Sequence, residues 1–330
     1  MKPPIKQPVD WLAVIKRIQS ALNKQESKYT NQLIEAYQGN YKQMRPYLHN
    51  IELLLEALPD ITPYALKRTK EFKQLVIAMD EQLTGFSNYA KVTIGLAIEA
   101  AALLGLASAK EWGLKPVEPT ALDVITRFLQ PDTALYERIG LWAGNARDNV
   151  IKAILEGVSL GKNPVTIGHD ITRAFGVELT DAIRASRTTQ LWAHREATRL
   201  GYIANGINYW CWYASLDEKT CGSCLSLHGK IFPSTEVMDD HYNGRCTMIP
   251  AETATSSLAF DSIVKGGWTT RGEDYFKSLS EAQQDKSLGI QKAQVLREGR
   301  ILFDQLSKQV DDAVYGTMRV ETPLKDLVND

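Results

Sequence analysis

Three of the four cysteines lie in one short window, from Cys221 to Cys246, together with two of the five histidines. Cys221 and Cys224 are separated by two residues, so they form a tight knuckle that can chelate one tetrahedral zinc ion, and a second pair of ligands from a later turn would close the site. The best set of four ligands is Cys221, Cys224, His241 and Cys246. His228 is a substitute ligand, or else a polar residue next to the Gly229 turn. Four protein ligands leave no position for water, so the expected role of zinc is to hold this loop together; without metal, the same window would hold reduced thiols near a turn.

Apolar residues recur at three- and four-residue spacing through most of the chain, which is typical of amphipathic helices. This pattern predicts successive helices from residue 11 to about residue 110, with turns at Pro46, Pro59 and Pro63. It predicts further helices at residues 121–129, 135–157 and 165–175, with breaks at residues 161–164 and at Gly176. A long helix is expected from about residue 180 to residue 204.

The pattern changes after this long helix. Residues 207–213 are aromatic and β-prone, which predicts a strand. Cys211 lies inside that strand and is expected to be a small buried hydrophobic residue rather than a ligand. Beyond Pro250, residues 256–272 resemble a loop, and residues 290–315 have helical spacing.

The sequence therefore predicts a mainly α-helical protein with a small β element beside the Cys/His knuckle. The stretch at residues 113–119 contains glycine and two prolines and cannot continue a helix, so we place a boundary there. The expected modules are a helical N-terminal module at residues 1–115, a central helical module with the Cys/His cluster at 116–255, and a loop and helical tail at 256–330.

Four arginines fall on one side of the long helix predicted before the strand. Its opposite side carries small residues that can pack closely against a neighbour. We expect an outward arginine face that could contact DNA or a partner, although such a face is more often solvated or paired with acidic residues. These arginines are Arg184, Arg187, Arg195 and Arg199.

Charge and hydropathy limit the classes of partner. The 38 basic residues are balanced by 39 acidic ones, so any DNA contact must come from a local patch. The N-terminus lacks the pattern of a signal peptide, so we expect the protein in the cytoplasm of its host. The most apolar segment, residues 92–109, contains Glu99 and is bounded by Lys91 and Lys110, which favours a helix buried among other helices over a membrane span.

The order of motifs across residues 151–250 resembles the phage head morphogenesis family, the proteins similar to Mu protein F. In that family an Arg-Thr-rich helix precedes an aromatic strand, and a Cys-x-x-Cys knuckle, a Leu-His-Gly-Lys-x-Phe run and a His-x-Asn-x-Arg-Cys segment follow. The matching residues here are Arg187, Thr188, Thr189, Trp210, Trp212, Leu216, Asp217, Thr220, Cys221, Cys224, Leu227, His228, Gly229, Lys230, Phe232, His241, Asn243, Arg245 and Cys246.

This resemblance implies a structural minor head protein of a tailed bacteriophage, not an enzyme. It implies contact with the portal protein or the major capsid protein, a place in the virion at the head interior or portal, and a role in head assembly and in DNA packaging or delivery. Weak contact with the packaged DNA would fit the same role. The chain has Gly244 where family members commonly have a cysteine, so metal binding here either uses Cys246 or has been lost.

Two metal-dependent nucleic-acid enzymes are the alternatives. A zinc deaminase would use His194, Glu196, Cys221 and Cys224, but Thr220 stands where the deaminase signature has proline. A nuclease would use His228, His241 and Asn243 around a metal. The deaminase would leave the fourth metal position to water, and the nuclease would need one histidine to activate water beside a metal held by other residues.

Overall fold

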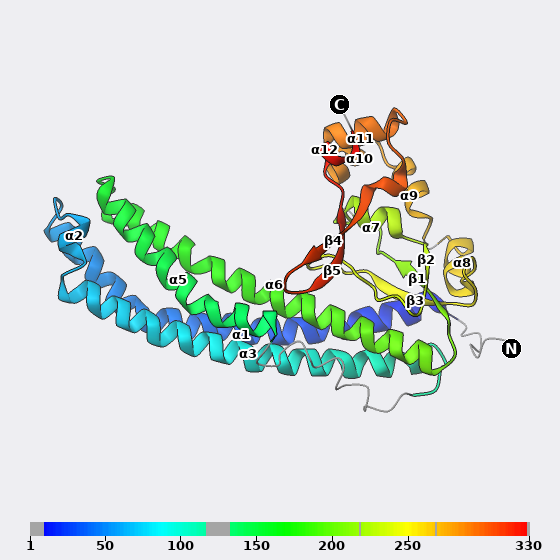
Figure 1. Cartoon of the computed structure of the whole chain (residues 1–330), viewed down its shortest axis with the longest axis horizontal. Coiled ribbons are helices and arrows are strands. Elements are labelled where there is room, and N and C mark those ends of the chain that lie inside the picture. Colours follow the sequence, from blue (N-terminus) through cyan, green and yellow to red (C-terminus); the bar gives the residue numbers. More distant parts are fainter. Residues whose placement is uncertain (1–9, 117–132, 218, 268, 329–330) are drawn as a thin grey trace. The chain divides into compact units, whose positions relative to one another are not determined.

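The computed structural model describes residues 10–116, 133–217, 219–267 and 269–328. The chain is mostly helical, and its helices and strands follow one another as Figure 1 shows. The elements are α1 (Trp11–Ala57), α2 (Pro63–Leu66), α3 (Lys70–Glu111), α5 (Ala134–Ser159), α6 (Pro164–Ala204), β1 (Tyr209–Tyr213), α7 (Gly222–Leu227), β2 (Ile231–Pro233), β3 (Thr247–Ala251), α8 (Leu258–Lys265), α9 (Gly272–Ser278), α10 (Glu281–Leu288), α11 (Ile290–Arg297), η3 (Phe303–Leu306), β4 (Ser307–Asp312), β5 (Gly316–Glu321) and α12 (Leu324–Leu327). The predicted mainly α fold with a small β element is confirmed.

The contacts divide the chain into two compact units. One unit consists of residues 25–97 and 127–189, and the other of residues 1–24, 98–126 and 190–330. The helices α1, α3 and α6 each contribute one stretch to each unit. The module boundaries near residues 115 and 255 are not tested by this division and stay a prediction.

The unit of residues 25–97 and 127–189 is built from helices. Its core consists of apolar side chains at helical spacing, with Leu33 and Met44 of α1 and Leu75 of α3 fully buried. Ile139 and Ile154 of α5 are also fully buried. The predicted break at residues 161–164 is confirmed, because α5 ends at Ser159 and α6 begins at Pro164.

Two predicted breaks are wrong, because helices continue through both positions. Pro46 lies inside α1, where it is exposed, so the helix carbonyl that it leaves without an amide donor can reach water. Gly176 lies inside α6, which starts at Pro164 rather than near residue 180. A helical glycine costs about 1 kcal/mol, and the buried Phe175 and Ala182 on either side of it hold the helix together.

The apolar residues 92–109 belong to α3, which is long and apolar enough to cross a membrane by length and composition alone. Just over half of its most apolar window, 56%, is buried inside the protein. The side chains of Ile94, Ala97, Ala101 and Ala102 are fully buried, while that of Glu99 is exposed. This matches the predicted helix packed among helices. The helix predicted at residues 121–129 lies outside the described residues.

The other unit contains a three-stranded antiparallel sheet of order β2-β1-β3. The predicted strand is β1, with Trp210 opposite Phe232 on β2 and Pro250 on β3. Trp210 stacks on Phe232 with ring centroids 4.7 Å apart. The sheet belongs to a core that also contains Trp11 and Trp112, and it carries the Cys/His window between its strands.

The helix predicted over residues 290–315 is wrong beyond Arg297. There α11 ends in a tight turn at Gly299, which has a φ of +70°, and the Arg300 amide donates to the Val295 carbonyl. A short 3-10 turn and the antiparallel hairpin β4–β5 follow, in which Val310 pairs with Met318. The Asp312 carboxylate accepts the amides of Val314 and Tyr315 in the turn of the hairpin.

Candidate metal centre

The first half of the site is the knuckle at the start of α7. Cys221 is the N-cap of this short helix, and its carbonyl accepts the Leu225 amide at 2.9 Å. The Cys224 amide donates to the Cys221 sulfur at 3.5 Å. This turn places both sulfurs on the same side, as the two-residue spacing predicts.

The second half is the loop at residues 239–246, which leads into β3. A turn closed by the Gly244 amide on the His241 carbonyl, at 2.9 Å, bends the chain, and Asn243 takes a φ of +56° in it. The His241 Nδ1 donates to the Tyr242 carbonyl at 2.8 Å. The other nitrogen, Nε2, therefore faces the knuckle as the free ligand atom, which is the arrangement that metal-ligating histidines usually have.

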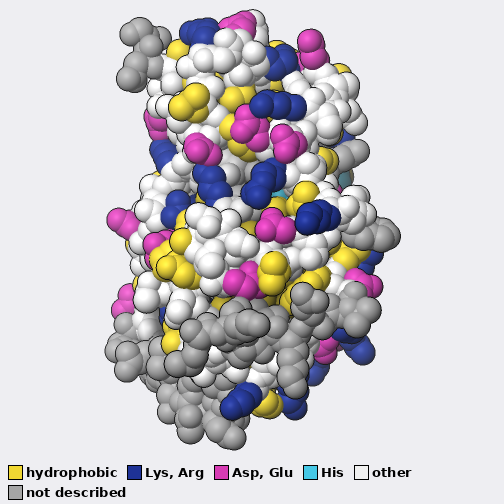
Figure 2. All heavy atoms as spheres, turned by 90° about the vertical axis from the view of Figure 1, so that its right-hand side faces the viewer, with side chains coloured by type: hydrophobic (Ala, Val, Ile, Leu, Met, Phe, Trp, Pro, Cys, Tyr) yellow, Lys and Arg dark blue, Asp and Glu magenta, His cyan; other side chains and the backbone are white. Residues whose placement is uncertain are grey.

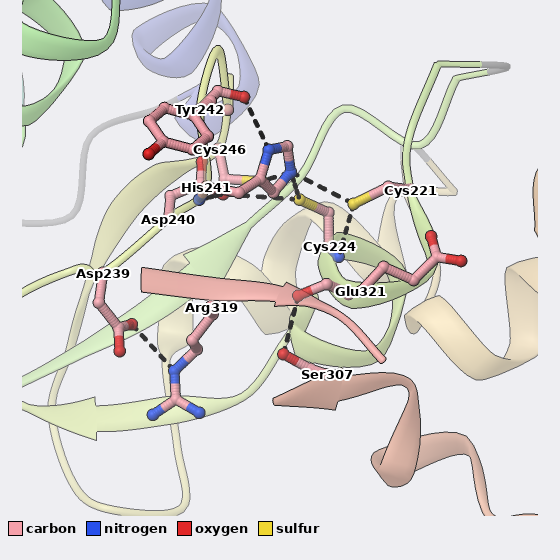
Figure 3. Close-up of polar contacts among 12 residues, drawn as sticks. Cys221, Cys224, Asp239, Asp240, His241, Tyr242, Cys246, Ser307, Arg319 and Glu321 are labelled. Carbon is pink, nitrogen blue, oxygen red and sulfur yellow. Dashed lines mark hydrogen bonds and ion pairs between the residues drawn. The ribbon is translucent and has the colours of Figure 1, made fainter. Parts of the chain in front are cut away.

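The two halves converge, as Figure 3 shows. The His241 Nε2 lies 3.2 Å from the Cys221 sulfur and 3.2 Å from the Cys224 sulfur. Cys224, Asp240 and Cys246 form a second group, so Cys224 is shared by both. Within each group the candidate ligand atoms lie within 4.8 Å of one another, and either group could hold a metal. The four predicted ligands thus come together around Cys224, at the edge of a cavity of about 250 Å³.

The thiols and the imidazole share protons through hydrogen bonds, and a metal that binds thiolate and imidazole would release those protons. The Cys224 thiol donates to the Cys221 sulfur, and this bond lowers the pKa of Cys221 to about 5 although burial opposes it. The same neighbour raises the pKa of Cys224, as do Cys246 and burial. Burial is the largest single effect on His241 and lowers its pKa, but the hydrogen bond with Cys221, the charges of Asp240 and Cys221 and the bond with the Tyr242 carbonyl together raise the pKa to about 10. Sulfur and imidazole donors in such a set fit zinc, because zinc prefers these ligands in tetrahedral sites.

A buried ion pair supports the loop from α6. The Arg195 Nη2 donates to the Asp240 carboxylate at 2.8 Å, and the two side chains are 5% and 0% exposed. Arg195 also donates to the carbonyls of Gly244, at 2.7 Å, and Cys246, at 2.9 Å. One side chain therefore fixes both ends of the turn that carries His241.

The Asp240 carboxylate that pairs with Arg195 also requires a glycine at position 244. A Cβ atom at this position would lie 2.1 Å from the Asp240 Oδ2, which is far inside van der Waals contact. The Asp240 carboxylate thus fills the space beside residue 244, and its Oδ1 lies 3.7 Å from the Cys224 sulfur. Two adjacent carboxylates, Asp239 and Asp240, directly precede His241 in the sequence, and this pairing is the signal that points to residues supporting the ligand.

The hairpin β4–β5 contacts both halves of the site (Figure 3). The Glu321 carboxylate accepts the Gly222 amide of the knuckle at 2.8 Å, and Arg319 pairs with Asp239 of the loop at 2.9 Å. Sequence reasoning missed this hairpin, because its contacts with the site join residues 70 or more positions apart and its residues carry no metal-binding pattern.

The structure places the other candidate residues away from the thiols. The His228 Nδ1 accepts the Ala214 amide at 2.9 Å, and its Nε2 lies 3.2 Å from the Thr269 hydroxyl. His194 is buried in α6, and burial lowers its pKa to about 4. Cys211 is fully buried in β1, where burial raises its pKa.

The predicted arginine face is not uniformly outward. Arg195 is buried, and Arg199 is 12% exposed and paired with Glu196 at 2.6 Å, so the expectation of an outward face is wrong for these two. Arg187 pairs with Glu26 at 2.5 Å, and Arg184, which is 42% exposed, pairs with Asp181 at 3.0 Å. Whether these arginines contact DNA or a partner stays a prediction.

Residues 148–249 match the family described as Phage Mu protein F like protein. This range contains all four predicted ligands and the whole of α6. The search of curated proteins and the search of solved structures find no match.

Residues 148–249 are therefore a Phage Mu protein F-like domain, as the motifs predict. The family is one of phage head morphogenesis and minor head proteins, whose members are generally structural proteins of the phage head.

Proposed function

We propose that this chain is a structural minor head protein of a tailed bacteriophage. It docks to the portal protein or to the major capsid protein at the inner capsid surface, and it acts in head assembly and in DNA packaging or delivery. The observation that carries this proposal is the convergence of Cys221, Cys224, His241 and Cys246 inside the Mu F-like domain. A set of four protein ligands stabilises a fold and leaves no position for a substrate.

In this proposal the four side chains hold one zinc ion, which supplies a cross-link between knuckle and loop. The knuckle orients two thiols, and the hydrogen bond from His241 to the Tyr242 carbonyl orients the imidazole. Arg195 holds the loop in place from α6. These contacts arrange the ligands before a metal binds, which favours a stable structural site.

The geometry favours this role over the two enzyme alternatives. A deaminase needs His194 beside Cys221 and Cys224, but the histidine that meets these thiols is His241. A nuclease that uses His228 needs a ring nitrogen free for metal or water, and both nitrogens of His228 face other partners.

Weak contact with packaged DNA belongs to the same proposal. On the face in Figure 2, basic and acidic side chains are interspersed among the described residues, which fits weak and salt-sensitive attraction. Arg184 is the most exposed of the four candidate arginines, so we expect the largest contribution from this residue.

The test is made in the phage that encodes the chain. Particles are purified free of scaffold and analysed by quantitative mass spectrometry, and the gene is deleted and then complemented with wild type or with Cys221→Ser. We expect the chain in mature particles, a large loss of infectious particles on deletion, and poor rescue by the variant. Mature particles that lack the chain, together with normal assembly after deletion, would contradict the proposal.

A further inference from the structure

The C-terminal hairpin β4–β5 lies against the knuckle at one end. The two carboxylate oxygens of Glu321 are used separately: one accepts the Gly222 amide at 2.8 Å, and the other pairs with Lys292 at 2.5 Å. The hydroxyls of Ser307 and Ser223 lie 2.7 Å apart. Both strands of the hairpin therefore contact the turn that carries Cys221 and Cys224.

The same hairpin contacts the loop that carries His241. The Arg319 amide donates to the Asp239 carbonyl at 2.5 Å, while its side chain pairs with the Asp239 carboxylate at 2.9 Å. That carboxylate also accepts the Gln309 side-chain amide at 2.7 Å. The Tyr242 hydroxyl, on the residue next to His241, donates to the Asp312 carboxylate. The loop is thus bound by side chains from both strands.

The two halves differ in what else holds them. The loop is fixed to α6 by Arg195, which donates to three acceptors in it. Among the described contacts, the knuckle has no comparable charged anchor to α6. The knuckle leads into β2, which pairs with β1 in the sheet, and the contacts that join the knuckle directly to the loop are those of the ligand cluster and of the hairpin that spans both.

We propose that the hairpin β4–β5 is a metal-coupled latch, whose docking across knuckle and loop and whose metal binding strengthen each other. This inference rests on the proposed metal site. A metal that joins the two halves fixes the spacing that the hairpin contacts require. By thermodynamic reciprocity, a docked hairpin raises metal affinity by the same factor by which metal favours docking.

Hydrogen exchange of the full chain tests one direction of the coupling. Backbone exchange is measured by mass spectrometry with zinc and after zinc removal by a chelator. We expect faster exchange across residues 307–321 after removal, including the Arg319 amide, whereas α5 in the other compact unit keeps its protection. Equal exchange of the hairpin with and without zinc would overturn the latch.

Metal affinity tests the other direction. Zinc affinity is measured by competition with a chromogenic chelator for wild type, Glu321→Ala and Arg319→Ala. Thr317→Ala is the control, because Thr317 bonds only across the hairpin in the described contacts, to Asp311 at 2.9 Å. We expect about 5- to 100-fold weaker binding in the first two variants and a change below about twofold in the control.

The outcomes separate the two proposals. A protein that binds zinc as tightly after Glu321→Ala and Arg319→Ala as before overturns the latch and leaves the metal site intact. A protein that binds no zinc at all overturns both. If the variants do not fold, the exchange comparison on the wild type decides the matter, because it needs no substitution.

Discussion

Arg195 on α6 and Asp240 in the metal-site loop form a 2.8 Å ion pair that is almost fully buried. We expect Asp240→Ala to destabilise the protein by about 3–5 kcal/mol, because it leaves a buried guanidinium without its charged partner. Chemical denaturation, followed by tryptophan fluorescence, measures this loss. The matched control is Glu111→Ala, which breaks the exposed pair with Arg17 and should cost at most about 1 kcal/mol. Similar losses in both variants would contradict a special role for the buried pair.

Glycine-to-alanine substitutions at two positions should change the stability of the protein in opposite directions. Gly244→Ala forces a Cβ atom to within 2.1 Å of the Asp240 carboxylate, so we expect a loss of about 1–3 kcal/mol. Gly39 lies inside α1 with nothing within 4 Å of the added atom, and Gly39→Ala should stabilise by about 0.5–1 kcal/mol. Thermal unfolding of both variants tests this, and a stable Gly244→Ala protein would show that Asp240 moves freely.

The stability of the protein should fall as the pH falls from about 6.5 to about 4. Burial lowers the pKa of His194 from 6.5 to about 4, so in this window the unfolded chain binds a proton that the folded protein does not. The contribution of His194 is complete above pH 6.5 and reaches up to about 3 kcal/mol. Denaturation at several pH values should give a flatter profile for His194→Gln than for wild type. His49→Gln, at an exposed position, should keep the wild-type slope, and an unchanged profile in His194→Gln would refute the assignment.

His228 and His241 should differ in their effect on metal binding. The His228 nitrogens face the Ala214 amide and the Thr269 hydroxyl, so His228→Ala should lower thermal stability and retain the metal. His241→Ala removes the nitrogen that lies 3.2 Å from two sulfurs, so it should lose the metal. Zinc content per folded chain after dialysis decides between them. Loss of zinc in His228→Ala alone would make His228 the ligand.

Local sequence signals were sufficient for part of the fold. The spacing of apolar residues identified the long helices before Ala204, and the aromatic run identified β1. The loop predicted at residues 256–272 is wrong where α8 (Leu258–Lys265) lies. Pro46 and Gly176 were wrongly predicted as helix breaks. The free energy that each costs a helix can be offset by buried neighbours, and these neighbours are a property of the tertiary structure. The hairpin was missed because its polar residues hide the two-residue period, while its turn depends on Asp312 and on Gly316 with a φ of +75°.

The metal site, too, could be predicted from local sequence signals only in part. The spacing of Cys221 and Cys224 in the sequence made them candidates, and the structure brings His241 to both sulfurs and Cys246 to Cys224. Arg195 was predicted on an outward face, because a helical wheel cannot show an acceptor 45 residues further along the chain. Arg195 is buried because it pairs with Asp240, a residue outside the helix that the helical wheel represents.

The central claim, a closed structural metal site in a Mu F-like domain, is tested most directly by elemental analysis of the purified full-length protein. Wild type is compared with Cys221→Ser, Cys224→Ser and Cys246→Ser, and Cys211→Ala serves as the control because Cys211 is buried in β1 outside the cluster. We expect about one zinc per chain in wild type and in the control, and its loss, together with a lower thermal midpoint, in the three serine variants. No zinc in the wild type, or zinc retained in all three serine variants, would contradict the claim.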